Sequence, residues 1–586
     1  MPPYTTENSG LAQAPPGGLP GLLDHWAAVY TKAAKCVALL ALCEMATFAG
    51  HSADNETQPK GSPGPVNDEI VTLEKFIVTA TRIGPPWRYT SLPGYEILSQ
   101  CDDSATNQYI RALLRGDSVM KLRLPHDCLA SAIPTSVILF DASTISGLTS
   151  SVIPRSVLAL DDGVLWGQRR PGRSFEETRA ADVDTMVDCW SLGGARFVDG
   201  EGRMTNVVPY HVITTFRFRL RKRVPVFPEW LIQGLVGRNG LYNAEMLKSA
   251  ADYEAGTTGS LTLPTAQWIS DAETVIVRKK PKLREAFLPL ETLFSEEHAK
   301  PLDRSPVWYA EAALFVRWGL YAQSFGKPIH RDAFWRFVGQ AISGPVTEKT
   351  FRDCFGFGYA EMESELARYF PVAVNNLITR DVDIDLDPKL PKLRDATPSE
   401  VGRIIGDWER IEGNTLKVEN PELGQAFLNQ ASKTLMKPYN DGSRDPQLLG
   451  VLGLYEFPID REISGKYLQG AADGYVMRPT VYTRLAQLRY DAAQSHPAGP
   501  EGRFSADQLA SVLGPLFVAR QQPPAMVETY RLMAKAWSQS AIKPTKEHLA
   551  ILDEGMMLFW PDNGLADDVN ALRSQWGYPP KPIRDN

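Results

Sequence analysis

The sequence predicts two structural parts, an α+β part followed by an all-helical part. Three observations support this fold class. Strand-like segments such as Tyr95–Leu98 and Ser136–Phe140 alternate with helical ones such as Ser104–Gly116 in the first part. After Pro398, apolar residues recur at three- and four-residue spacing over most of the remaining sequence, as expected for helices with one buried face. A length of 586 residues fits two or three domains.

Composition and charge narrow the function classes. Apolar residues make up 43% and charged residues 22% of the sequence, which excludes a disordered, collagen-like or coiled-coil chain. The net charge is -7, from 62 basic and 69 acidic residues. Proteins that hold nucleic acid by counterion release are usually basic or carry a basic domain, so we expect no nucleic-acid partner.

The first 53 residues are predicted to be a leader containing a signal peptide. Lys32 and Lys35 precede an apolar run over residues 36–49, and small residues follow it. Glu44 interrupts the run, and the alternative is a buried core helix. The signal-peptide pattern leads us to expect an exported protein of the periplasm or cell envelope. Because the run is too short to cross a bilayer, we expect no transmembrane span in the mature chain.

Export would place the later cysteines in an oxidising environment, where one or two disulfides are allowed. Four of the six cysteines follow the leader, and three full pairings among them stay open. These residues are Cys101, Cys128, Cys189 and Cys354.

The second part is predicted as nine helices, several of which begin just after a proline or an aspartate. They are Ser399–Ile411, Pro421–Met436, Pro446–Tyr455, Arg461–Ala472, Thr480–Ala493, Ala506–Arg520, Pro524–Gln539, Lys546–Phe559 and Leu565–Trp576. Short helices in series favour an array of helical hairpins. The stretch from Asp445 to Ala493 resembles a degenerate tetratricopeptide pair, with Gly453 on its first helix and Pro479 opening the next hairpin. The alternative is an ordinary helical bundle.

The most informative stretch covers residues 206–240. Its segment from Pro228 to Val236 contains Pro228, Trp230, Leu231, Gly234 and Leu235. This segment resembles the P-x-W-L-x-E-G-L-A box of gluzincin (thermolysin-like) zinc peptidases of the peptidase-MA-like group. In that family a helix carries H-E-x-x-H, and the Glu of the box is the third zinc ligand. His211 stands 22 positions before Gln233, which occupies the position of that Glu.

Other segments extend the resemblance over about residues 85–372. Leu92–Ser99 and Ser136–Phe140 are similar to sheet strands of the family, Trp308–Val316 to its Y-A-x-S-x-A helix, and Phe351–Tyr369 to its closing element. The resemblance therefore implies a gluzincin-like domain over 85–372. Around it we predict a linker and entry strand at 54–84, a second linker at 373–397 and the tetratricopeptide-like helical domain at 398–580.

The departures from the family pattern point to a lost activity. Aligning His211 with the second histidine places Val207 at the first histidine and Val208 at the general-base glutamate. A catalytic zinc needs three protein ligands, and neither a valine nor the neutral amide of Gln233 replaces them. We therefore predict a pseudopeptidase without zinc or another cofactor.

The dense basic run beside these positions has two interpretations. It could bind nucleic acid or anionic lipid, but an exposed helix end is the preferred reading for an isolated run in an acidic chain. The run comprises Arg217, Arg219, Arg221, Lys222 and Arg223.

The leading hypothesis is an exported, inactive peptidase-like scaffold that binds a protein or peptide through its helical domain. The alternative is an active zinc peptidase with non-standard ligands, which predicts bound zinc and a requirement for His211. A third hypothesis is a purely structural envelope protein, in which Gln233 and His211 are buried and no peptide binds.

Overall fold

The computed structural model describes residues 86–121, 124, 134–140, 158–159, 165–166, 177–192, 196–198, 204–206, 208–237, 260–263, 287–295, 306–322, 330–375, 378–381, 388–560 and 562–581. The predicted leader, the strand expected at Ile70–Ala80 and Cys128 lie outside these residues. Residues 80–586 form one compact unit.

A six-stranded mixed sheet organises the first part, with strand order β12-β1-β2-β3-β7-β6. The strands are β1 (Arg88–Leu92), β2 (Tyr95–Ser99), β3 (Thr135–Phe140), β6 (Glu177–Ala181), β7 (Met186–Ser191) and β12 (Arg394–Asp395). The central strands β2, β3 and β7 are parallel, and the outer pairings are antiparallel. β3 is buried along its whole length, as its continuous apolar sequence predicts for a central parallel strand.

Short two-stranded ladders accompany this sheet among the described residues. They are β4 (Leu158–Ala159) with β5 (Leu165–Trp166), β8 (Arg196–Val198) with β9 (Met204–Asn206), and β10 (Ser260–Leu263) with β11 (Ile378–Asp381).

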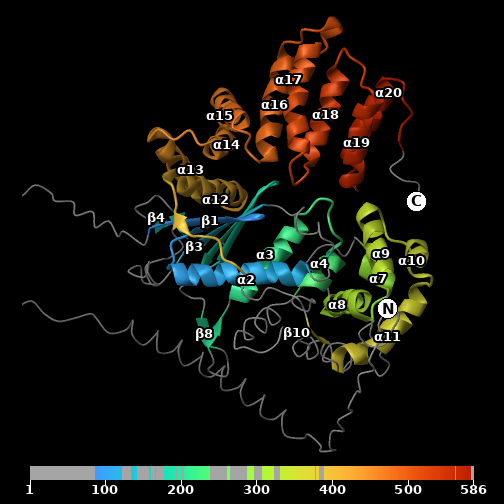
Figure 1. The fold of residues 1–586 in the computed structure, drawn as a ribbon. Coiled ribbons are helices and arrows are strands. Elements are labelled where there is room, and N and C mark those ends of the chain that lie inside the picture. The colour runs from blue at the N-terminus through green and yellow to red at the C-terminus, as the bar shows by residue number, and fades with distance from the viewer. Residues whose placement is uncertain are drawn as a thin grey trace, which may run out of the picture. The chain divides into compact units, whose positions relative to one another are not determined.

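Helices cover both faces of the sheet (Figure 1). Because successive strand residues point to opposite faces, Ile97 and Val137 pack with α2 (Asp103–Lys121) and α3 (Val208–Arg221) on one face. Leu98 and Ile138 pack on the other face with residues of α12 (Pro398–Glu419), including the fully buried Trp408. The predicted helical part thus supplies the second covering layer of the sheet.

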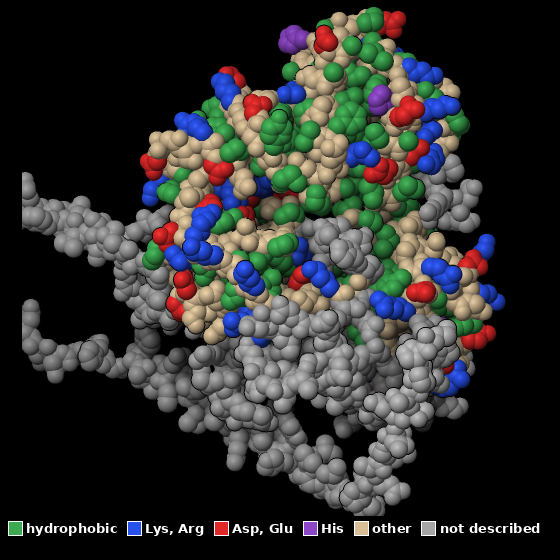
Figure 2. All heavy atoms as spheres, in the orientation of Figure 1, with side chains coloured by type: hydrophobic (Ala, Val, Ile, Leu, Met, Phe, Trp, Pro, Cys, Tyr) green, Lys and Arg blue, Asp and Glu red, His purple; other side chains and the backbone are tan. Residues whose placement is uncertain are grey.

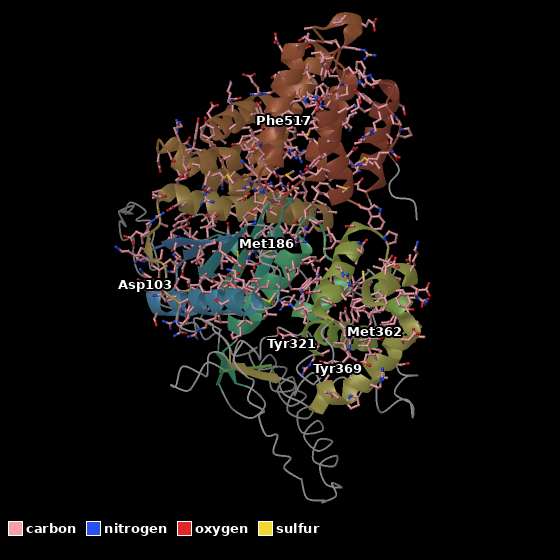
Figure 3. The ribbon with its side chains drawn as sticks, turned by 45° about the vertical axis from the view of Figure 1, so that its right-hand side comes forward. Asp103, Met186, Tyr321, Met362, Tyr369 and Phe517 are labelled. Atoms are coloured by element: carbon pink, nitrogen blue, oxygen red, sulfur yellow. The ribbon has the colours of Figure 1, made fainter. Side chains whose placement is uncertain are left out.

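A helical cluster rich in aromatic residues continues from α3. It contains α4 (Glu229–Val236), α7 (Leu290–Phe294), α8 (Pro306–Tyr321), α9 (Arg331–Ser343), α10 (Glu348–Phe355) and α11 (Tyr359–Asn375). Trp230 of α4 lies in its core, with ring centroids 5.4 Å from those of both Phe294 and Phe315. Tyr321 of α8 and Met362 and Tyr369 of α11 lie in this same part of the molecule (Figure 3).

The predicted helices after residue 398 are confirmed, with shifts at some ends. The structure has α12, α13 (Pro421–Asn440), α14 (Pro446–Glu456), α15 (Arg461–Asp473), α16 (Pro479–Ser495), α17 (Ala506–Arg520), α18 (Val527–Gln539), α19 (Lys546–Leu558) and α20 (Asn563–Gln575), plus a short 3-10 turn at Pro500–Gly502. Local capping signals explain why these helix starts could be predicted. Asn420 and Asp445, the residues just before Pro421 and Pro446, are N-cap residues whose side chains accept hydrogen bonds from backbone N–H groups in the first turn.

The helices pair as antiparallel neighbours along the chain, α12 with α13, α14 with α15 and α16 with α17. Gly453 allows α14 and α15 to approach closely, since a Cβ there would lie 2.6 Å from the Leu468 side chain. The first helices of these pairs begin at Pro398, Pro446 and Pro479, so their spacing is not constant. The tetratricopeptide identity stays a prediction.

Three further findings concern the chain's organisation. β12 lies inside the predicted linker 373–397 and pairs with β1. The buried residues Cys101 and Cys189 belong to the core clusters on opposite faces of the sheet, and Cys354 is a buried thiol in α10. Within the described residues, no helix combines the length and apolar character needed to cross a bilayer.

Candidate functional site

The positions that correspond to the zinc site begin at the first turn of α3. Val207 lies outside the described residues, and α3 begins at Val208. Pro209 is the second helical residue, where the backbone N–H has no partner within the helix, so the proline is compatible with the helix. The Val208 side chain is buried in the core cluster beside α2 and the sheet. The position aligned with a general base thus carries a packed apolar group.

His211 is half-buried and lies against the sheet. Its ring stacks on Trp190 of β7, with centroids 3.8 Å apart and planes inclined by 15°. A second contact ties the same two elements together, because Thr215 donates its hydroxyl hydrogen to Asp188 Oδ2 at 2.6 Å. The imidazole therefore belongs to the packing between α3 and β7.

Gln233 is buried on α4, with only 6% of its surface exposed. Its Nε2 donates to Glu229 Oε1 at 2.7 Å, and Glu229 also forms an ion pair with Arg221 at the end of α3. The Gln233 amide therefore belongs to a network in which Glu229 links it to Arg221 at the end of α3. Sequence reasoning missed Glu229 as the neighbour of Gln233, although their i, i+4 spacing on one helix is the signal for it.

The remaining box residues pack the helical cluster. Trp230, Leu231 and Leu235 are buried in the same core. A Cβ on Gly234 would lie 2.4 Å from Val316 and 2.7 Å from the Ala312 carbonyl oxygen, so glycine permits the close approach of α4 to α8. Pro228 precedes α4 as its N-cap residue, and these five positions therefore have a structural explanation.

These side chains do not fit a catalytic zinc. Two imidazoles and a carboxylate are needed at the ligand positions, whereas His211 stacks on an indole and Gln233 offers a neutral amide that is already hydrogen bonded. Over the part of the chain that the structure describes, no group of three or more His, Cys, Asp and Glu side chains is arranged to hold a metal ion.

Part of the basic run is buried in the fold. Reading it as an exposed helix end is wrong for Arg219 and Arg223, which are buried. Their guanidinium carbons each lie 4.1 Å from an aromatic centroid, that of Tyr95 and that of Phe227 respectively. Lys222 is exposed. On the face drawn in Figure 2, basic and acidic side chains of the described residues are interspersed, without a patch of one sign.

A cavity of about 700 Å³ lies at the other end of α3. Its walls come from the β1–β2 turn, the amino ends of β2 and β3, the loop before β7, and helices α2, α3, α12 and α14, closed by the α15–α16 loop and Pro523. Met186, at the start of β7, marks this end of the sheet near the C-terminal helices (Figure 3). Arg219 lines the cavity, whereas His211 contacts the carboxyl end of β7.

Buried ion pairs form much of the cavity wall. Arg403 of α12 donates to both carboxylate oxygens of Glu96 on β2, at 2.8 and 2.6 Å. Burial by itself would raise the pKa of Glu96, but the Arg403 guanidinium holds that pKa below its usual value. Arg478 of the α15–α16 loop donates to Asp407 of α12 at 2.7 Å. Burial opposes ionisation of Asp407 as well, yet Arg478 lowers its pKa.

Two further hydrogen bonds hold the loop between β6 and β7 to the helices. The Thr480 N–H donates to Asp184 Oδ2 at 2.8 Å, and Arg410 donates to Asp182 Oδ2 at 2.7 Å. The loop before β7 is thereby held to α12 and to the start of α16. Sequence reasoning proposed no functional role for these residues, and among the cavity-lining residues it weighed such a role only for Arg219, through the basic run.

The chain was compared with known families, curated proteins and solved structures. No family model, no curated protein and no solved structure matches the chain.

Proposed function

We propose that the chain is an exported, catalytically inactive peptidase-like protein that binds a protein partner and acts as a scaffold of the cell envelope. The proposal joins the sequence resemblance over residues 85–372 to the geometry of the positions that would carry catalysis. Its localisation rests on the predicted signal peptide alone.

The observation that carries the loss of catalysis is the state of Val208 and Gln233. Val208 is packed in the core, so no group at that position takes a proton from a water. The Gln233 amide is neutral and is already hydrogen bonded to Glu229. Catalysis by the family's mechanism would require an acidic general base at position 208 and an anionic zinc ligand at position 233. The surrounding core would have to open to admit a charged group in place of Val208.

We propose that the partner binds away from the positions that correspond to the zinc site. Gln233 is buried and His211 is half-buried against Trp190, which agrees with a closed cleft at that end of α3. The helical pairs α12–α17 and the cavity beside them offer the alternative surface. Arrays of helical hairpins commonly bind proteins over extended surfaces of this kind.

Metal content tests the proposal most directly. The full chain is dialysed, incubated with a small excess of zinc, dialysed again and examined by elemental mass spectrometry, beside a His211→Ala variant. We expect zinc far below one atom per chain in both proteins, and no hydrolysis of a fluorogenic peptide mixture by either. Near-stoichiometric zinc that disappears in the His211→Ala variant would overturn the proposal in favour of an active peptidase with non-standard ligands.

A further inference from the structure

Exposed apolar side chains lie in segments that line the cavity. Met477 lines the cavity and keeps 70% of its surface exposed. Tyr475, two residues before it on the same loop, is 84% exposed, and Val183 is exposed beside the cavity residue Asp184. Large apolar groups gathered at a cavity mouth are typical of an interaction site.

The loop holds Tyr475 outward in an unusual backbone conformation. Tyr475 has φ of +54°, in the left-handed region that residues other than glycine rarely adopt. The flanking residues anchor the loop: Val476 is buried and donates its N–H to the Ala471 carbonyl, and Arg478 is bound to Asp407. The fold thus maintains a strained residue whose side chain contacts solvent, a combination that is concentrated at ligand-binding sites.

The charges of the wall determine which group can enter. Arg403 is paired with Glu96, Arg478 with Asp407, and Lys121 with Asp117 at 2.5 Å. The remaining cavity-lining arginine, Arg219, lies over the Tyr95 ring. A charged ligand group would have to compete with one of these ion pairs or with the contact between Arg219 and Tyr95, in a partly buried site. An uncharged group leaves all of them intact and gains contact with the apolar part of the lining, which includes Leu92, Ile404 and Val451.

We infer that this cavity receives an uncharged apolar or aromatic side chain of a partner polypeptide, with Tyr475 and Met477 of the α15–α16 loop contacting the partner's chain beside it. A small molecule inside the cavity would leave the exposed surface of Tyr475 uncovered, whereas a polypeptide that continues past the mouth covers it. This inference rests on the proposed function and assigns the partner site to one loop and one cavity.

Photo-crosslinking on the full chain tests the inference. The probe is an acetylated and amidated Gly/Ser heptapeptide with a central benzoylphenylalanine, compared with versions whose flanking residues are Glu or Lys. After irradiation, labelled residues are mapped by mass spectrometry. We expect labelling at residues 475–478 and in the β1–β2 turn, strongest for the uncharged probe. Met477→Glu should reduce labelling by about fivefold or more, because it places a charge at the mouth.

The matched control is Met557→Glu on α19, which adds the same charge at another exposed methionine, 56% exposed. It should leave labelling unchanged, and both variants should melt like the parent protein. Labelling elsewhere, an equal loss in both variants, or preference for a charged probe would overturn the inference. So would protection by free N-acetylphenylalanine amide as effective as protection by the unlabelled heptapeptide, since that result identifies a small-molecule site.

The zinc measurement separates the two proposals. Absent zinc together with absent labelling rejects this site and leaves the proposed function standing. Stoichiometric zinc rejects the proposed function, whatever the labelling pattern.

Discussion

Glu311 provides the sharpest test of the packing described above. Its carboxylate is fully buried in α8, where Oε2 accepts the Leu288 N–H at 2.9 Å and Oε1 has no hydrogen-bond partner among the described residues. Burial raises the pKa of Glu311 to about 8; the bond from Leu288 opposes this rise, and the nearby Glu363 carboxylate adds to it. Glu311 is therefore mostly protonated at neutral pH in the folded protein.

The sign of the pH dependence follows from this raised pKa. The folded state holds the proton more tightly than the unfolded state, whose carboxyl has the ordinary value of 4.5. The stability linked to protonated Glu311 is therefore fully present below pH 4.5 and is lost as the pH rises through about 8. At about 1.4 kcal/mol per pH unit, the loss is roughly 3 kcal/mol by pH 7 and up to about 5 kcal/mol above pH 8.

The perturbation is Glu311→Gln, which keeps the shape of the side chain and cannot ionise. We expect the variant to match the parent near pH 5 and to become progressively more stable than the parent up to pH 8. Urea denaturation followed by tryptophan fluorescence at pH 5, 6, 7 and 8 measures the difference. Glu422→Gln, which neutralises an exposed carboxylate on α13, is the control and should show a difference that does not grow with pH.

A difference between Glu311→Gln and the parent that stays constant from pH 5 to pH 8 would refute the reasoning. A parent protein more stable than the variant at pH 8 would do so as well, because it would mean that the ionised carboxylate is stabilised where it lies.

Two further predictions concern close packing and buried charge. Gly234→Ala should cost about 1–3 kcal/mol of stability, because its Cβ would lie 2.4 Å from Val316. Gly339→Ala should gain about 0.5–1 kcal/mol, because Gly339 is an exposed position of α9 where a Cβ meets nothing within 4 Å. Thermal unfolding of the two variants measures these effects, and equal effects would contradict the prediction. Arg478→Met should cost about 1.5–3 kcal/mol, because Asp407 loses the bond from Arg478 but keeps the one from Arg410. Adding Asp407→Leu should recover part of this loss in urea denaturation, and a double variant less stable than the single one would count against the pairing.

The helical part was predictable because its signals are local. Apolar spacing and capping residues lie within each helix, and Ala506–Arg520 was predicted to the residue. The ends moved where packing extends a helix: α12 continues to Glu419 rather than ending at Ile411, since Gly413 allows α13 to lie against it. In contrast, α18 is shorter than predicted and begins at Val527 rather than Pro524.

The cavity could not be predicted from local pattern. Arg403 and Glu96 are separated by 307 positions along the chain, and nothing near either residue indicates the other. The sequence singled out Gln233 and its neutral amide, but its hydrogen bond to Glu229 and the burial of Arg219 depend on how α3, α4 and the sheet meet. Long-range contacts therefore set the chemistry of both regions.

The covering of the sheet by α12 also shapes how the chain is made. Synthesis proceeds from the amino terminus, so β2, β3 and β7 leave the ribosome before α12 does. Until then, Leu98 and Ile138 have no covering layer. The nascent chain consequently exposes an apolar, aggregation-prone face of the sheet until residue 419 has been translated. A chaperone that covers this face during that interval would protect the protein from aggregation.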